Sequence, residues 1–256
     1  MQTSDITAVI PAYNAETTLV EVICNLRTSL PNLSIIVIND GSQDATGRKA
    51  KSMNIIYLEH SRNRGKGAAL KTGFRKALSL GLSYILTVDA DTQHNPKYVP
   101  AMLRKLKEEN LDLLIGSRMS RIETMPFKRV VSNKITSRLI SWRTKQEITD
   151  SQCGFRLIRT SVLESLTLKC QKYDLESELI IKAALKGYRI GFVEIDTIYA
   201  KNRVSYVKFV DILRFIRVYC SSFFWERSNL NGSVRDIGAR RSLASSRKEE
   251  CHSKAI

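Results

Sequence analysis

The stretch Tyr84-Ile-Leu-Thr-Val-Asp-Ala-Asp-Thr-Gln93 joins an apolar run to a cluster of acidic and polar side chains. The run over residues 84–88 is typical of a buried strand. Two carboxylates on either side of one small residue can hold a divalent cation, and that cation can neutralise a diphosphate. Asp91 could instead cap a helix that begins near Pro96. The Asp-x-Asp spacing alone leaves both interpretations open.

Outward from this stretch, the first 116 residues alternate short apolar runs with amphipathic segments. Continuous apolar strands separated by helices predict an α/β fold, a Rossmann-like, mostly parallel sheet with helices on both faces. Strands are expected at residues 6–10, 35–38, 55–58, 84–88 and 111–115, and helices at residues 16–29, 44–53, 66–80 and 96–109.

Polar residues follow four of the expected strands. In an open parallel sheet, ligands bind beyond the carboxyl ends of the strands, so these segments should converge on one crevice. The Asp40 carboxylate could accept hydrogen bonds from a nucleobase or ribose, and the Tyr13 ring could stack on a base. Ordinary strand-to-helix turns would explain the same residues. The four segments are Pro11–Glu16, Asn39–Ser42, Asp89–Gln93 and Gly116–Arg118.

Glycines and cations in the segment 63–70 precede an expected helix and form a potential phosphate cradle. The chain has neither the G-x-x-x-x-G-K-[ST] spacing nor G-x-G-x-x-G, which argues against P-loop ATPases and dinucleotide-dependent dehydrogenases. His94 lies near the Asp-x-Asp pair in the sequence, and we expect it to be a solvated loop histidine.

The charge balance is strongly basic. Among 256 residues, 41 Lys and Arg against 25 Asp and Glu give a net charge of +16. Such a field favours anionic partners: nucleotides, nucleic acid or an acidic membrane surface. The five cysteines are scattered and form no C-x-x-C pair, which argues against a disulfide framework and indicates a reducing cytosol. The chain contains no run of 18 uncharged apolar residues, so the sequence predicts no ordinary transmembrane helix.

The second half has a different character. Residues 118–145 carry eight cations against the single acid Glu123. A helix is expected at Leu175–Leu185 and a returning strand at Tyr188–Ile195. We interpret residues 1–227 as one domain, with a first half over 1–118 and a second half over 119–227. The basic segment 228–256 is predicted to be a disordered tail.

Six motifs occur in order and together resemble glycosyltransferase family 2. Within that family they are similar to the branch of dolichyl-phosphate mannosyltransferase and related polyprenyl-phosphate sugar transferases, over about residues 5–217. The motifs are VIPAYNAE (9–16), VINDGSQDAT (37–46), NRGKGAALKTGF (63–74), TVDADTQHNP (87–96), GSR (116–118) and DSQCGFRLIR (150–159).

The resemblance implies a GT-A fold, a nucleotide-diphosphate sugar donor of the GDP-mannose or UDP-glucose type, Mg²⁺ or Mn²⁺, and inversion at the anomeric carbon. It also implies roles for residues at matching positions. The nucleotide would be held by Pro11, Tyr13, Glu16 and Asp40. The metal and diphosphate would be arranged by Asp89, Ala90, Asp91 and Gln93, of which Asp89, Asp91 and Gln93 would bind the metal. Arg118 would contact the transferring region, Asp150 would lie on the acceptor side, and Arg203 and Lys208 would contact phosphates.

The acceptor can be a lipid phosphate or a sugar hydroxyl. A hydroxyl would require a carboxylate base such as Asp150, whereas a polyprenyl or dolichyl phosphate is already anionic. The basic region 118–145 favours the lipid phosphate. A family 2 transferase that extends a glycan on a hydroxyl is the first alternative. A basic nucleic-acid-binding or non-catalytic nucleotide-binding protein is the second, and the acidic strand ends argue against nucleic acid.

The segment Tyr206–Trp225 has apolar residues at helical spacing, and several charges interrupt it. Those charges would make a membrane-spanning helix costly, but a helix in the interface plane tolerates them. We therefore expect an enzyme on the cytoplasmic face of a membrane, peripherally bound through this amphipathic helix. A helix packed on the protein's own sheet is the alternative.

Overall fold

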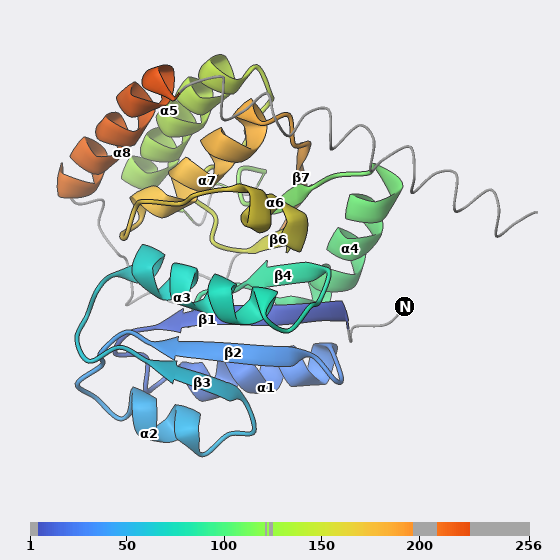
Figure 1. Ribbon diagram of the computed structural model, residues 1–256, viewed down its shortest axis with the longest axis vertical. Helices are drawn as coiled ribbons and strands as arrows, with labels where there is room; N and C mark the ends of the chain where they lie inside the picture. The colour runs from blue at the N-terminus through green and yellow to red at the C-terminus, as the bar shows by residue number, and fades with distance from the viewer. Residues whose placement is uncertain (1–4, 121, 123–124, 197–208, 226–256) are drawn as a thin grey trace, which may run out of the picture.

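The computed structural model describes residues 5–120, 122, 125–196 and 209–225. Its centre is a seven-stranded sheet in the order β3-β2-β1-β4-β6-β5-β7 (Figure 1). The strands are β1 Ile6–Ala12, β2 Ser34–Asn39, β3 Ile56–Glu59, β4 Tyr84–Thr87, β5 Leu113–Ser117, β6 Arg156–Arg159 and β7 Ile190–Glu194.

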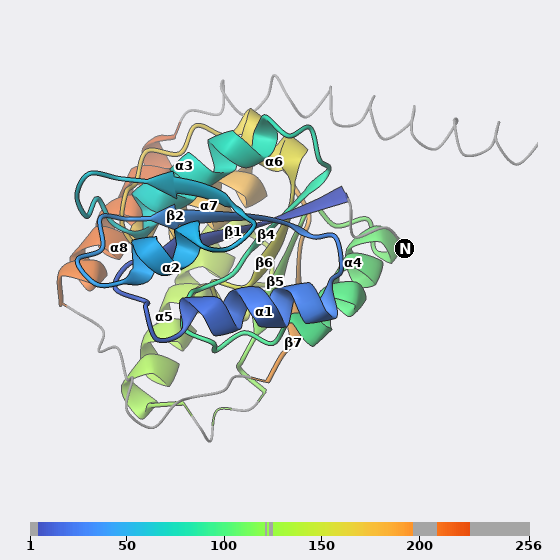
Figure 2. The same ribbon diagram turned by 90° about the horizontal axis from the view of Figure 1, so that it is seen from below.

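Helices cover both faces of the sheet. Figure 2 shows α1 on one side and α3 with α6 on the other, so the predicted α/β architecture is confirmed. The helices are α1 Leu19–Ser29, α2 Thr46–Lys51, α3 Lys66–Leu78, α4 Val99–Glu108, α5 Phe127–Thr144, α6 Thr160–Ser165, α7 Asp174–Leu185 and α8 Phe209–Ser221, with 3₁₀ helices η2 Pro96–Tyr98 and η4 Ser222–Phe224.

The strands β1, β2 and β4 are buried apolar runs, as their sequences predict, whereas β3 at the edge of the sheet is only partly buried. All seven residues of β1 except Pro11 are buried, and so is every residue of β4. On α3, Gly73 lets the helix approach the sheet closely, because a Cβ there would lie 2.4 Å from Cγ1 of Val9. The predicted helix 175–185 and returning strand 188–195 correspond to α7 and β7, and β7 pairs in parallel with β5.

Strand β6 is the exception to the parallel arrangement. It lies antiparallel between β4 and β5, with Arg156 opposite both Thr87 and Ile115. Because β6 runs against its neighbours, it begins at the edge where the parallel strands end. The loop that precedes it, residues 150–155, is therefore brought to the carboxyl ends of β4 and β5.

Chain order reverses beside β1, which pairs with β2 on one side and with β4 on the other. Such a switch point is where open α/β sheets bind ligands. Among the described residues, no helix combines the length and apolar character needed to cross a membrane. The predicted basic tail, residues 228–256, lies outside the described residues.

Candidate active site

The four polar strand ends meet, as the sequence predicts. The backbone N–H of Asn14 donates to Oγ of Ser42 at 3.0 Å, which joins the loops after β1 and β2. Thr18 Oγ1 donates to the carbonyl of Ala90 at 2.6 Å, which joins the β1 and β4 loops. The Gly116 N–H donates to the carbonyl of Phe155 at 2.9 Å. The candidate site therefore lies beside the β1/β4 switch point.

Asp89 forms an ion pair with a lysine that the sequence analysis did not single out. Lys66 Nζ, at the start of α3, lies 2.6 Å from Asp89 Oδ1 and 2.9 Å from a carboxylate oxygen of Glu176 on α7. Burial alone would lower the pKa of Lys66, but the two carboxylates outweigh it and raise that pKa. Burial opposes ionisation of Asp89, yet Lys66 brings its pKa down to about 2. Both partners are therefore charged at neutral pH.

Asp91 is in a different electrostatic environment from Asp89. Burial raises the pKa of the Asp91 carboxyl, and the neighbouring Asp89 carboxylate raises it further. Its Oδ1 accepts a hydrogen bond from the Gln93 N–H at 3.1 Å. The helix cap is made by Asn95 instead, whose Oδ1 accepts from the Lys97 N–H at 3.0 Å at the start of η2. The helix-cap interpretation of Asp91 is therefore wrong.

The pair Asp89 and Asp91 suits a hard divalent cation, because carboxylate oxygens are the ligands that Mg²⁺ and Mn²⁺ prefer. The Asp89 carboxylate contributes to the raised pKa of Asp91, which indicates repulsion between two carboxylates that a cation would relieve. Among the described residues, no group of three or more His, Cys, Asp or Glu side chains could hold a metal. The protein can therefore offer two carboxylates, and a bound diphosphate would supply further oxygens.

Two further residues pack directly against Asp89: Gly154, which the sequence analysis did not single out, and His94, which it predicted to be in solvent. A Cβ at Gly154 would lie 2.5 Å from Asp89 Oδ2, so only glycine fits beside this carboxylate without displacing it. On the other side, Nδ1 of His94 accepts the Asp89 N–H at 3.3 Å, and its ring stacks on Phe155 at 5.1 Å. Burial lowers the pKa of His94 to about 4. The expectation of a solvated loop histidine is wrong.

Asp150 lies on the far side of β6 from Asp89 and is completely buried. Its carboxylate accepts hydrogen bonds from the Arg118 backbone N–H (3.1 Å), Nε (2.8 Å) and Nη2 (2.9 Å), from Asn133 Nδ2 (2.7 Å) and from the Gln152 N–H (3.2 Å). Burial opposes ionisation, but Arg118 outweighs it and holds the pKa of Asp150 below its usual value. A carboxylate held in this way is poorly suited to act as a base, and the catalytic role of Asp150 stays a prediction.

Asp40 is also engaged within the protein. It is 2% exposed, and its carboxylate accepts the N–H groups of Arg64 at 3.0 Å and Gly65 at 2.7 Å. His60 Nδ1 lies 2.7 Å from Asp40 Oδ1. The Ala68 N–H donates to the carbonyl of Gln171 at 2.8 Å. Because these backbone donors are occupied, the potential phosphate cradle at residues 63–70 is not formed in this structure.

The remaining predicted donor residues line the same region. The Tyr13 ring is 48% exposed beside the loop after β2, so it is accessible for stacking. Glu16 Oε2 accepts the Ala45 N–H at 2.9 Å and thereby fixes that loop. Pro11 pairs with Ile38 between β1 and β2. The part these residues play in donor binding stays a prediction. Arg203 and Lys208 lie outside the described residues.

The arginine of the DSQCGFR motif, Arg156, is buried and has a structural role. Arg156 is 2% exposed, and its guanidinium donates to the carbonyls of Ser151 (3.0 Å), Cys153 (2.8 Å) and Glu176 (3.0 Å). It therefore ties the 150–155 loop to α7, which carries the Glu176 partner of Lys66. This arginine supports the site without facing a ligand, since its donors are taken by backbone carbonyls.

Residues 7–167 match the family model described as Glycosyl transferase family 2, which spans more than half of the chain. The chain belongs to glycosyltransferase family 2. The prediction that this protein is a glycosyltransferase is thereby confirmed.

Named relatives of this transferase include two enzymes of lipid-linked sugars. It is 31% identical to the UDP-N-acetylglucosamine–dolichyl-phosphate N-acetylglucosaminyltransferase of Methanococcus voltae, over 77% of this chain and 87% of that one. It is 28% identical to the undecaprenyl-phosphate mannosyltransferase of Micrococcus luteus, over 73% of this chain and 81% of that one.

Among solved structures, the transferase is similar to glucosyl-3-phosphoglycerate synthase from Mycobacterium tuberculosis, solved with Mn²⁺, uridine diphosphate and phosphoglyceric acid. The TM-score is 0.64 at 20% sequence identity, and the match covers 88% of this chain and 78% of that one. At this identity the likeness concerns the fold, and it confirms the predicted GT-A architecture.

Proposed function

We propose that this transferase moves a sugar from a nucleotide-diphosphate sugar to a polyprenyl or dolichyl phosphate, with inversion at the anomeric carbon. An oxygen of the lipid phosphate attacks C1 of the sugar while the bond from C1 to the diphosphate breaks. The nucleoside diphosphate leaves with the electron pair. The observation that carries this proposal is the saturated, low-pKa carboxylate of Asp150.

The acceptor argument rests on proton transfer. A sugar hydroxyl needs a general base within hydrogen-bond reach and with a suitable pKa. Asp150, the acid predicted on the acceptor side, accepts five hydrogen bonds and has a depressed pKa. A lipid phosphate needs no such base. The two relatives named above, whose names include dolichyl and undecaprenyl phosphate, support the same acceptor class.

On the donor side, the proposal assigns Mg²⁺ or Mn²⁺ to the carboxylates of Asp89 and Asp91, with Gln93 beside them. When bound, the ion would supply positive charge to the leaving diphosphate. The Lys66 ammonium would add a second positive charge, and its ion pair with Glu176 would retain it when Asp89 turns to the metal. The nucleotide would lie over Tyr13 and near Asp40.

The deciding experiment is transfer from GDP- and UDP-linked sugars to a polyprenyl phosphate and, in parallel, to free sugar hydroxyls. We expect transfer to the lipid phosphate in the presence of Mg²⁺ or Mn²⁺ and loss of transfer in EDTA. Greater transfer to hydroxyls would overturn the proposed acceptor, and full activity in EDTA would overturn the metal assignment.

The surface over α5 and α8 supports a membrane location for this reaction. Along α8, Phe209 is 71% exposed and Leu213 is 50% exposed, while Phe215 and Val218 are buried. On α5, Ile135 is 55% exposed. Trp142 on α5 contacts Phe223 of η4 at 6.0 Å, so the two apolar stripes join. An exposed apolar area with basic neighbours is typical of peripheral membrane binding.

Most large apolar residues of α5 lie on its exposed face, whereas an ordinary surface helix buries its apolar face. Its inward face is largely polar: Asn133 donates to Asp150, and Ser137 Oγ donates to Ser151 Oγ at 3.0 Å. The alternative prediction for residues 206–225 is a helix packed on the protein itself, and it describes only the buried residues of α8, Phe215 and Val218. We therefore propose that α5 and α8 together rest on the membrane that holds the acceptor.

Vesicle flotation tests the membrane part separately. We expect the full chain to float with anionic vesicles and less with neutral ones, because the net charge is +16. The variant Leu213→Ser/Ile216→Ser should reduce the flotation that persists at high salt. Val20→Ser, which changes an exposed apolar residue on α1, should not. Protein that stays at the bottom with anionic vesicles at low salt would contradict membrane binding.

A further inference from the structure

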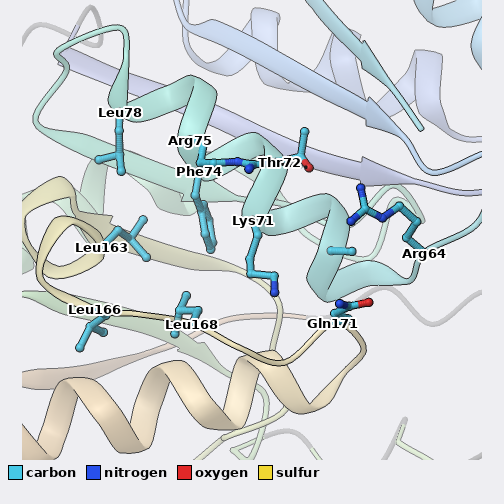
Figure 3. A pocket seen from close by; sticks show the side chains of 11 residues that line it. Arg64, Lys71, Thr72, Phe74, Arg75, Leu78, Leu163, Leu166, Leu168 and Gln171 are labelled. Atoms are coloured by element: carbon cyan, nitrogen blue, oxygen red, sulfur yellow. Dashed lines mark hydrogen bonds between the residues drawn. The ribbon is translucent and has the colours of Figure 1, made fainter. Parts of the chain in front are cut away.

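A cavity lies between α3 and the segment 163–171, away from the Asp89 carboxylate. Its volume is about 360 Å³, within the roughly 300 to 1,000 Å³ of sites that bind small molecules. Figure 3 shows side chains of α3 and of the facing segment pointing into the same space. The proposed transfer reaction does not use this cavity.

The charged part of the lining is entirely basic. Arg64, Lys71 and Arg75 contribute to the wall, and the described lining includes no acidic residue. None of these three cations forms an ion pair with a carboxylate of the described residues. Lys71 Nζ donates to the carbonyl of Lys169 at 3.0 Å, and Arg75 Nη2 lies 3.4 Å from Thr72 Oγ1. The cavity therefore offers positive charge without an internal counter-charge.

The rest of the lining is apolar. Phe74 and Leu163 are buried, and Leu166 and Leu168 are partly buried against the core. In Figure 3, Phe74 extends from α3 toward the leucines of the facing segment, and Lys71 extends beside it. A ligand that fits both parts must combine an anionic group with an apolar body.

Helical spacing separates this cavity from the Asp89 site. Lys66 and Gly73 lie on the face of α3 that meets Asp89 and the sheet. Lys71 and Arg75 are four residues apart and lie on the other face. The two sites still share a wall, because Thr72 Oγ1 lies 3.0 Å from His60 Nε2, and His60 Nδ1 contacts Asp40. The cavity is thus distinct from the site and adjacent to its predicted nucleotide-binding end.

We propose that the cavity binds an organic anion that carries one phosphate or carboxylate on a hydrocarbon body. The anionic group lies beside the Lys71 ammonium, and the hydrocarbon lies against Phe74, Leu163 and Leu168. Arg64 and Arg75, elsewhere in the same wall, add positive charge. The proposal goes beyond sugar transfer and does not depend on it. A lipid phosphate is also the proposed acceptor, so variants of Lys71 and Arg75, which lie outside the transfer site, distinguish binding in this cavity from acceptor binding.

Isothermal titration of the full chain with dodecyl phosphate, below its micelle concentration, tests the site. Dodecanoate, dodecanol and inorganic phosphate serve as companion ligands. We expect dodecyl phosphate or dodecanoate to show a saturable component of binding that Lys71→Gln/Arg75→Gln removes, and the ligand with the tighter component identifies the anionic group. Dodecanol and inorganic phosphate should bind at least about tenfold more weakly, since each satisfies only one part of the lining.

Variants locate the binding. Lys71→Gln and Arg75→Gln should each weaken dodecyl phosphate binding about tenfold, because each removes one charged donor. Lys76→Gln removes a cation of the same helix outside the lining and should leave the affinity unchanged. Equal binding of dodecanol, no saturable binding, or the lack of any binding component that Lys71→Gln/Arg75→Gln removes would overturn the proposal.

Discussion

Asp89 and Asp150 are two ion-paired carboxylates near the carboxyl ends of the strands, and they differ in what surrounds them. The side chain of Asp89 is 26% exposed and pairs with Lys66, which is shared with Glu176. The Asp150 side chain has no exposed surface and accepts hydrogen bonds from Arg118, Asn133 and Gln152. One carboxylate can change partners at moderate cost, whereas the other is fixed by its surroundings.

The comparison separates a binding carboxylate from a structural one. Lys66 keeps Glu176 if Asp89 takes another cation, so breaking the Lys66–Asp89 pair leaves no isolated charge. Removing Asp150 would leave the Arg118 guanidinium buried without its carboxylate, which costs several kcal/mol in proteins. A low pKa alone does not distinguish the two; the number of partners does.

The largest effect is expected at the Asp89 side. Asp91→Asn should lower kcat/KM roughly 10²- to 10³-fold, comparable to the loss of one preorganised group at a developing charge. Folding should be unaffected, because asparagine Oδ1 can still accept the Gln93 N–H. Steady-state kinetics and urea unfolding measure the two quantities. Glu108→Gln, an exposed acid on α4, is the control, and near-normal turnover in Asp91→Asn would remove this residue from the site.

At the Asp150 side, stability should change as well as activity. Asp150→Asn should reduce the free energy of unfolding by about 3 to 5 kcal/mol, because the buried guanidinium loses its counter-charge. Adding Arg118→Met should restore part of that loss, since the guanidinium that has lost the Asp150 carboxylate is then absent. A double-mutant cycle from urea unfolding measures the coupling. Unchanged stability together with a large loss of kcat would identify Asp150 as a catalytic base and would favour the hydroxyl acceptor.

The sequence predicts the parallel half of the fold and the location of Asp89 well. Buried strands and the loops that follow them have local signals, so residues 84–93 could be interpreted alone. Strand β6 has only four residues, two of them arginine, and lacks a strand pattern. Helix α5 could not be oriented, because its buried face includes Asn133 and Ser137 and its exposed face includes Ile135 and Trp142.

The sequence alone also could not predict which residues contact the site residues. Lys66 and Glu176 are far apart along the chain, and only the packing of α3 against α7 brings them to one carboxylate. The role of Gly154 depends on the antiparallel direction of β6, which no local pattern indicates. Loop residues adjacent to a motif, such as His94, can equally be solvated or buried, and tertiary packing decides which.

The pH dependence of stability should show a smaller effect on the Asp89 side, through His94. Burial lowers the pKa of His94 to about 4, below the about 6.5 of an unfolded chain, so unfolded protein binds a proton that folded protein does not. Above pH 6.5 this group does not reduce the free energy of unfolding, and that free energy falls as the pH drops toward 4. Between pH 7 and pH 5 the loss should be about 2 kcal/mol in the metal-free protein.

His94→Gln removes the titrating ring while its amide oxygen can still accept the Asp89 N–H. Urea unfolding of the metal-free variant and wild type at both pH values isolates the His94 contribution. We expect the variant to lose about 2 kcal/mol less than wild type on acidification. Equal losses in the two proteins would show that His94 does not carry the effect.

The smallest effect should come from Gly154→Ala, which touches only the Asp89 side of the comparison. The added methyl would lie 2.5 Å from Asp89 Oδ2, so the carboxylate must move away from its present position. Displacing one ligand should weaken Mn²⁺ binding in the presence of nucleoside diphosphate roughly tenfold, as for changes that support a metal ligand from outside. Gly191→Ala is the matched control, because its Cβ would meet Leu111 at 2.4 Å, far from either carboxylate. Both variants should lose stability, but only Gly154→Ala should change the Mn²⁺ affinity measured by titration calorimetry. If both variants bind Mn²⁺ as wild type does, Asp89 is not a metal ligand, and the difference between the two carboxylates would be one of packing alone.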